Sequence, residues 1–328
     1  MMQKYEKVAS KHIIFFQPKN KVKLLLSLHL NKNHTKTLMK KLLICLSIIL
    51  FTLSGCNFGN SQRDKNIISV SILPEKYFID RLTGEAIEVN VMVPPGASHA
   101  TYSPTPMQFQ KLSDSRLYIS IGHLGYEQAW ANRLKELNPD MKNLNLSEKT
   151  SLIRGGEIQH GDHVHEGGID PHIWLSPKVM LELLPSIKDA IIASFPDLKE
   201  IVEDNYPVLF GEINATHIEV QKVSNSLTSK KFMIFHPALT YLARDYGLVQ
   251  ISIEHEGKEP SPLKLAATID EALSNRIGVI FIQEEYDVRN AKLISKETGA
   301  EMVQINPMAY DWIKSIDEIM KSFQTHLQ

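Results

Sequence analysis

The stretch KFMIFHPALTYLARDYGLVQISI, residues 231–253, contains two strand-like segments with a helical segment between them. Residues 231–235 and 248–253 are rich in β-branched and aromatic side chains, which favour strands. The residues between them have helical spacing. A strand, a helix and a second strand in succession are typical of a parallel pair, because parallel strands need a crossover connection. This stretch therefore predicts the α/β class.

The same alternation continues on both sides of this stretch. Residues 177–228 contain helical patterns and no strand, and their second helix is long enough to be a stiff connector. Further strands are predicted at 67–73, 87–93, 117–121, 278–283 and 300–305. We predict two α/β lobes, each with a mainly parallel sheet flanked by helices, joined by a long rigid helix. Their boundaries are 66–200 for the first lobe, 201–229 for the connecting helix and 230–328 for the second lobe.

An export signal precedes this fold. Residues 39–56 read MKKLLICLSIILFTLSGC, in which two lysines, an apolar run and small residues lead to a cysteine. This order is typical of a lipoprotein signal peptide with lipid attached to Cys56; the alternative is a buried core helix. The apolar run is shorter than the roughly 20 residues that span a bilayer. We therefore predict an extracytoplasmic protein, lipid-anchored to a bacterial membrane.

The residues before Met39 fit no export pattern. We predict that translation starts at Met39; the alternative is an unusually long basic leader. Residues 1–55 are then the leader and signal peptide, and residues 56–65 are a polar tether.

The charge of the body favours cations as partners. Residues 1–55 hold ten lysines and one glutamate, which leaves 26 basic and 36 acidic residues and a net charge near −10. Nucleic acid is a poor partner for such a chain, because its backbone requires clustered Lys and Arg. Both cysteines, Cys45 and Cys56, belong to the export signal. A metal site in the body must therefore use His, Asp or Glu.

Two histidines occupy equivalent places in the two lobes. His99, in VPPGASHATYSPTP, and His236, in FMIFHPALTYLARDYG, each follow a predicted strand. Ligands of open α/β sheets bind beyond the carboxyl ends of the strands. Either histidine alone has a surface residue as its alternative, but the repeated placement favours a site in the cleft between the lobes.

His172, in DPHIWLSP, has neighbours that fix its direction. Pro171 restricts the backbone and Trp174 can pack beneath the ring. Asp170 can accept the second N–H, which is the usual arrangement for a metal-bound histidine. The alternative is a helix-capping Asp-Pro with an incidental histidine.

Other candidates have two readings each. Asp311 lies between the last predicted strand and the last helix, so it is either an N-cap or a metal ligand. The glycine-rich stretch around His160, His163 and His165 is either a loose metal-binding loop or a solvated loop. The remaining histidines of the body are predicted to be structural or surface residues: His123, His217, His255 and His326.

Five motifs in this order resemble the substrate-binding lipoproteins of zinc and manganese ABC transporters. They are VPPGASHATYSPTP, DPHIWLSP, HPALTYLARDYGL, EPSP (259–262) and ISKETGAEMVQINPM. The resemblance covers about Asn66 to Phe323. It implies two lobes with one metal ion in the cleft between them, bound by His99 and His172 from the first lobe and His236 from the second. Asp311 is the implied fourth ligand, with a water or another acid as the alternative.

The resemblance also implies the function. It predicts a monomeric binding protein, not an enzyme, that captures Zn²⁺ and delivers it to an ABC transporter permease for high-affinity uptake. Zinc members of this family carry a histidine at the third ligand position and a histidine-rich loop, whereas manganese members tend to carry Glu there. Three imidazoles and a carboxylate independently suit Zn²⁺ better than Mn²⁺. The alternatives are a manganese-binding protein of the same family, a zinc-dependent hydrolase and a metal-binding adhesin.

Overall fold

The computed structural model describes residues 66–154, 158–160, 163–165, 168–254, 260–286 and 288–327. The predicted leader, the start at Met39, the lipid site Cys56 and the tether 56–65 lie outside the described residues.

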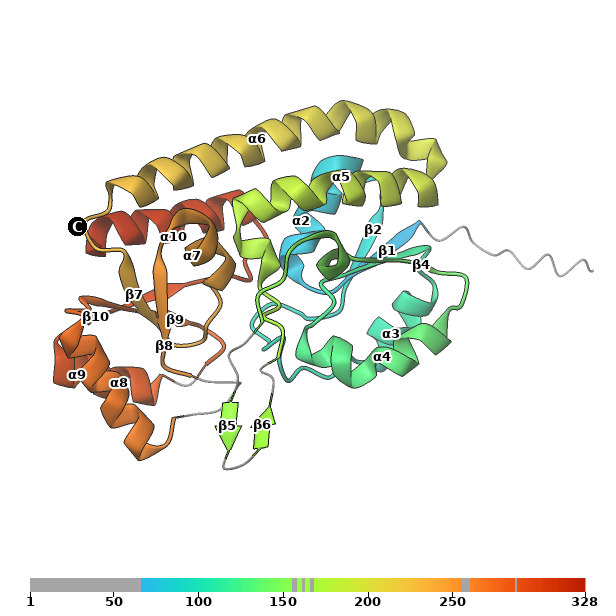
Figure 1. Cartoon of the computed structure of the whole chain (residues 1–328). Helices are drawn as coiled ribbons and strands as arrows, with labels where there is room; N and C mark the ends of the chain where they lie inside the picture. The colour runs from blue at the N-terminus through green and yellow to red at the C-terminus, as the bar shows by residue number, and fades with distance from the viewer. Residues whose placement is uncertain are drawn as a thin grey trace, which may run out of the picture. The chain divides into compact units, whose positions relative to one another are not determined.

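The first lobe is a four-stranded parallel sheet with helices on it (Figure 1). Its strand order is β2-β1-β3-β4, and every neighbouring pair is parallel. The strands β1 and β3 are buried along their whole length, as expected for central strands covered on both faces. The elements are β1 (Ile67–Val70), α2 (Leu73–Thr83), β2 (Glu88–Val91), α3 (Pro106–Ser113), β3 (Leu117–Ser120), α4 (Gly125–Leu137) and β4 (Lys142–Asn145).

The second lobe repeats this topology. Its order β10-β9-β7-β8, read from the other end, matches that of the first lobe, and all of its pairs are parallel. The predicted fold class is therefore confirmed. The elements are β7 (Lys231–Ile234), α7 (Thr240–Tyr246), β8 (Val249–Ser252), α8 (Pro262–Ser274), β9 (Val279–Gln283), α9 (Arg289–Thr298), β10 (Glu301–Ile305) and α10 (Trp312–His326).

Two long helices, α5 (Pro177–Ser194) and α6 (Lys199–Ser226), follow the first lobe (Figure 1). α6 has 28 residues, so it is about 42 Å long. It contacts α2 and α5 at one end and α7 and α10 at the other. Its buried side chains recur at helical spacing and keep one face against both lobes: Val202, Leu209, Ile213, Val220 and Val223.

The sequence pattern did not reveal three short strands. β4 has the sequence KNLN, of which only Leu144 is buried, so it lacks the apolar run of a buried strand. The histidine-rich stretch, predicted as a loop, contains a hairpin of β5 (Ile158–His160) and β6 (His163–His165), in which His160 pairs with His163. Strands of three residues are too short to show a period of two.

Tryptophans tie the two lobes together. Trp174, in the short helix η2 (Ile173–Leu175), donates its Nε1–H to the carbonyl of Pro307 at 3.0 Å. Trp312 donates in return to the carbonyl of Trp174 at 2.6 Å. Both rings are fully buried, so each satisfies its N–H inside the core. Within the described part of the chain, none of the helices combines the length and apolarity needed to cross a bilayer.

Candidate metal centre

Three histidines that are far apart in the sequence meet in the cleft. His99 lies on the loop after β2, His172 precedes η2, and His236 follows β7. The Nε2 atom of His172 is 3.1 Å from that of His99 and 3.2 Å from that of His236. All three rings are buried, with exposed fractions of 7%, 3% and 8%. The structure therefore brings three of the predicted site residues together.

Carboxylates behind two of the rings fix their tautomers. Nδ1 of His172 lies 2.9 Å from Oδ1 of Asp170, and Nδ1 of His236 lies 3.0 Å from Oε2 of Glu254. An ionised carboxylate only accepts, so each Nδ1 carries the hydrogen. Both Nε2 atoms then present lone pairs to each other, an arrangement that a cation between them would stabilise. A tetrahedral ion with Zn–N bonds of 2.0–2.1 Å separates its nitrogens by ~3.4 Å, close to the observed spacing.

Aromatic rings hold the same two imidazoles in place. The ring of Trp174 is 5.2 Å from that of His172, and Tyr286 stacks on His236 at 4.6 Å with an interplanar angle of 15°. The predicted contacts of His172 with Asp170 and Trp174 are thus confirmed. Both rings have little freedom to turn away.

His99 has no carboxylate behind it, although the ring of Trp174 lies edge-on to its ring, with centroids 6.0 Å apart. Its Nδ1 is buried without a hydrogen-bond partner among the described residues. Burial, and then the nearby His172 and His236, hold the pKa of His99 well below its usual range. Burial also lowers the pKa of His236, although Glu254 opposes that effect. Both rings are therefore neutral at neutral pH, as a metal ligand must be.

The carboxylate behind His172 is held in its charged form. Burial raises the pKa of Asp170, but its contacts with His172 more than offset burial, so the pKa lies below the usual value. A charged Asp170 keeps its role as an acceptor for Nδ1.

The predicted fourth ligand lies elsewhere. Asp311 is exposed, caps α10 and accepts a hydrogen bond from the Lys314 N–H at 3.1 Å. The group of described residues that can share one ion contains only the three histidines. The N-cap alternative accounts for the contact that Asp311 makes.

A different carboxylate lines the histidine cavity. Glu285, on the loop after β9, borders this cavity together with His99, His172 and His236. Burial, and then the neighbouring Glu284, raise the pKa of Glu285. Glu285 was not among the site residues predicted from the sequence. Its position two residues after the predicted strand 278–283 was the available signal, because His99 and His236 also follow predicted strands.

The other histidines are accounted for by local contacts. His217 meets the Tyr246 hydroxyl at 2.8 Å, His123 meets the Gln128 amide at 3.3 Å, and His326 meets Glu301 at 3.5 Å. These structural or surface roles agree with the prediction. His255 lies outside the described residues, and the side chains of His160, His163 and His165 do too.

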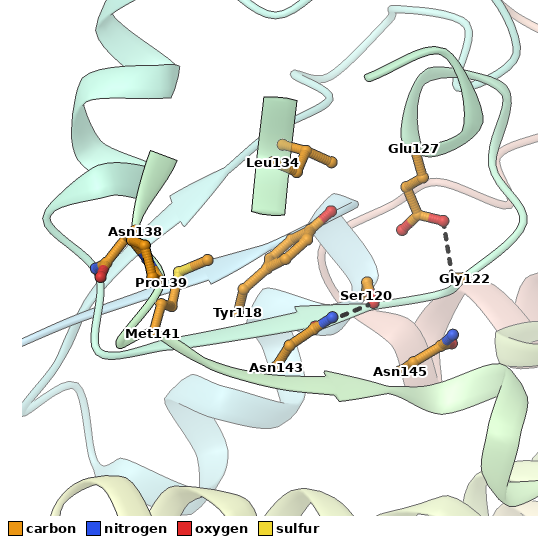
Figure 2. A pocket seen from close by; sticks show the side chains of 10 residues that line it. All are labelled: Tyr118, Ser120, Gly122, Glu127, Leu134, Asn138, Pro139, Met141, Asn143 and Asn145. Atoms are coloured by element: carbon orange, nitrogen blue, oxygen red, sulfur yellow. Dashed lines mark hydrogen bonds between the residues drawn. The ribbon is translucent and has the colours of Figure 1, made fainter. Parts of the chain in front are cut away.

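A larger cavity lies away from the histidines. A cavity of about 440 Å³ lies over β3 and β4, lined by amides, hydroxyls and apolar side chains (Figure 2). Some of its polar side chains already have partners: Ser120 donates to Asn143, and Glu127 accepts from the Gly122 N–H. The cavity among the histidines has a volume of only about 10 Å³, room for one ion or water. Ligand chemistry therefore favours the smaller space.

Sequence comparison relates the chain to zinc-binding proteins. The zinc-binding lipoprotein AdcA of Streptococcus pneumoniae is 28% identical over 284 residues, which cover 82% of this chain and 56% of that protein. The chain thus spans about half the length of this relative.

Structural comparison gives the same relation. A crystal structure of ZnuA has 32% identity and a TM-score of 0.73, covering 80% of this chain and 99% of that one. A crystal structure of a ZnuA deletion mutant with zinc bound has 31% identity and a TM-score of 0.71, covering 80% and 98%. The family described as zinc-uptake complex component A, periplasmic, matches residues 68–325, and the chain belongs to this ZnuA family.

Proposed function

We propose that this protein captures Zn²⁺ outside the cytoplasm and delivers it to the permease of an ABC transporter. The observation that carries this proposal is the convergence of three buried imidazoles: the Nε2 atom of His172 lies 3.1 Å from that of His99 and 3.2 Å from that of His236. Carboxylates contact the Nδ1 atoms of His172 and His236. The names of the relatives, a zinc-binding lipoprotein and a ZnuA with zinc bound, support it.

Zinc is favoured over manganese by the donor set. His99, His172 and His236 offer three imidazole nitrogens, which suit the borderline Zn²⁺, whereas Mn²⁺ ranks lowest among the divalent ions at such sites. We propose that Glu285, and not Asp311, supplies the carboxylate that completes the shell, since it borders the same cavity.

Transport is favoured over hydrolysis by the space around the ion. A zinc hydrolase keeps an open position for water and a general base, with room for the substrate beside the metal. The cavity of about 10 Å³ leaves no room for a peptide or ester. Binding and release of the ion itself are the chemistry that such a site supports.

The proposal includes the parts of the chain outside the fold. Cys56 would carry the lipid that anchors the protein, and residues 57–65 would hold the body away from the membrane as a monomer. His160, His163 and His165 would gather Zn²⁺ weakly near the ordered site. Deleting residues 159–166 should leave one tightly bound zinc, and loss of that zinc would contradict this division of roles.

Metal competition with elemental analysis tests the proposal. The purified full-length chain, stripped of metal and then offered Zn²⁺ and Mn²⁺ together, should retain one zinc, and His172→Ala should lose it. Preference for manganese, or zinc retained by the variant, would contradict the assignment of the site.

A further inference from the structure

Three groups of the second lobe support His236 at once. Glu254 follows β8 and meets the ring at Nδ1, at 3.0 Å. Gln283, the last residue of β9, brackets the backbone of His236: its Oε1 accepts from the His236 N–H at 3.3 Å, and its Nε2 donates to the His236 carbonyl at 2.7 Å. Tyr286 covers the ring face. The carboxyl ends of β7, β8 and β9 therefore define one orientation for this imidazole.

Among these groups, Glu254 alone determines which ring nitrogen carries the hydrogen. Gln283 contacts only the backbone of His236, and Tyr286 contacts only the face of the ring. Glu254 is 4% exposed, and its own N–H donates to the carbonyl of Phe235 at 2.9 Å, so its main chain is fixed beside β7. A carboxylate fixed in this way can determine the tautomer of the His236 ring.

We propose that Glu254 is a positioning residue of the zinc site, which holds His236 in the tautomer that presents its Nε2 lone pair to the ion. The inference rests on the proposed function and deepens it. Without an acceptor at Nδ1, the neutral ring can carry its hydrogen on Nε2 instead, and that tautomer cannot bind a metal through Nε2. The carboxylate also makes the imidazole a more basic ligand.

Charge gives Glu254 a second effect on the ion. Three neutral histidines and one carboxylate in the shell leave one of the two positive charges of Zn²⁺ uncompensated in a buried site. Glu254 lies directly behind one ligand, as Asp170 lies behind another. Each carboxylate offsets part of the charge of the ion through the imidazole that it contacts.

The test measures zinc affinity in Glu254→Leu and Glu254→Gln, made in the full-length chain. A chelator competition should give roughly 10–100-fold weaker zinc binding for Glu254→Leu, the usual range for loss of such a partner. Glu254→Gln should lose less zinc affinity than Glu254→Leu, because its amide oxygen can still accept from Nδ1. It should still lose some affinity, because the negative charge is gone. The absorption spectrum of bound Co²⁺ should change in Glu254→Leu, since it reports the geometry of the ligands.

Glu127→Gln is the matched control for a purely structural effect. Glu127 is a buried carboxylate that accepts from the Ile121, Gly122 and Leu124 N–H groups and has no contact with the histidines. This variant should unfold more easily but bind zinc as tightly as the unmodified chain. Zinc affinity of Glu254→Leu within twofold of the unmodified chain would overturn the inference. If Glu254→Leu does not fold, Glu254→Ala takes its place, since alanine also lacks an acceptor for Nδ1, and unchanged zinc affinity in that variant would overturn the inference.

The experiment separates this inference from the function on which it rests. Absence of zinc binding by the unmodified chain would contradict the proposed function. Tight binding by the unmodified chain and by both Glu254 variants would contradict only the role of Glu254.

Discussion

The two lobes share one topology but support their histidines differently. In the second lobe, His236 lies two residues beyond the end of the central strand β7 and is held by Glu254, Gln283 and Tyr286. In the first lobe, His99 lies eight residues beyond the end of the edge strand β2, and its Nδ1 has no partner in the described structure. The comparison teaches that a strand end alone does not orient a ligand. Orientation comes from acceptors on neighbouring strands.

The largest expected effect is the loss of zinc affinity when a ligand histidine is replaced, and it should differ between His99 and the other two histidines. Binding free energies of about 10–16 kcal/mol for structural zinc, shared among four ligands, assign each ligand roughly 10²–10³-fold in affinity. We expect His172→Ala and His236→Ala to lose that much. His99→Ala should lose less zinc affinity, because no acceptor at the Nδ1 of His99 makes this imidazole a more basic ligand. Isothermal titration with a competing chelator measures all three, and equal losses would break the comparison.

Lowering the pH should weaken zinc binding over a range that depends on the pKa values of the same histidines. Protons compete with zinc for the imidazoles, and burial lowers the pKa values of His99 and His236 in the metal-free protein. Affinity should therefore stay nearly constant down to the ordinary imidazole pKa of ~6.5 and fall only below it. Below the lowered pKa values of these rings, each ring that becomes protonated should weaken zinc affinity about tenfold per pH unit. Chelator competition from pH 8 to pH 5 gives the profile, and a steep loss between pH 8 and 7 would contradict it.

The three histidines could be predicted from the sequence, but only some of the groups that contact them could. His99, His172 and His236 stand in recognisable contexts, after a strand or after Asp-Pro. Asp170 was found because it is two residues from its histidine. Glu254 was not, because its contact with His236 depends on β8 pairing with β7, and strand order is a property of the sheet. Asp311 was predicted as a ligand but caps a helix. A residue between a strand and a helix can serve in either role, so its place in the sequence does not distinguish an N-cap from a metal ligand.

The loop that carries His99 can be displaced without changing any proposed ligand. Gly125, at the start of α4, faces the carbonyl oxygen of Ala100, which would lie 2.0 Å from an added Cβ. Gly125→Ala must therefore shift backbone next to His99, and such overpacking costs about 1–3 kcal/mol of unfolding free energy. We expect zinc affinity to fall several-fold with it.

The control for this substitution is Gly211→Ala. Gly211 lies within α6, where an added Cβ meets nothing within 4 Å. Alanine there should raise the unfolding free energy by roughly 0.5–1 kcal/mol and leave zinc binding unchanged. Denaturant unfolding and the chelator competition report the two quantities. If Gly125→Ala binds zinc as tightly as Gly211→Ala does, the position of His99 is less critical than its burial indicates.

The smallest expected effect concerns Asp311, where a cap and a ligand predict opposite results. Its carboxylate accepts from the Lys314 N–H at the start of α10, and the residue is exposed. Asp311→Ala should lower the unfolding free energy by about 1 kcal/mol, the usual cost of losing an N-cap, with zinc affinity unchanged. Asp311→Ser keeps a capping oxygen and should recover most of that stability. A tenfold loss of zinc affinity in both variants would instead return Asp311 to the ligand set in place of Glu285.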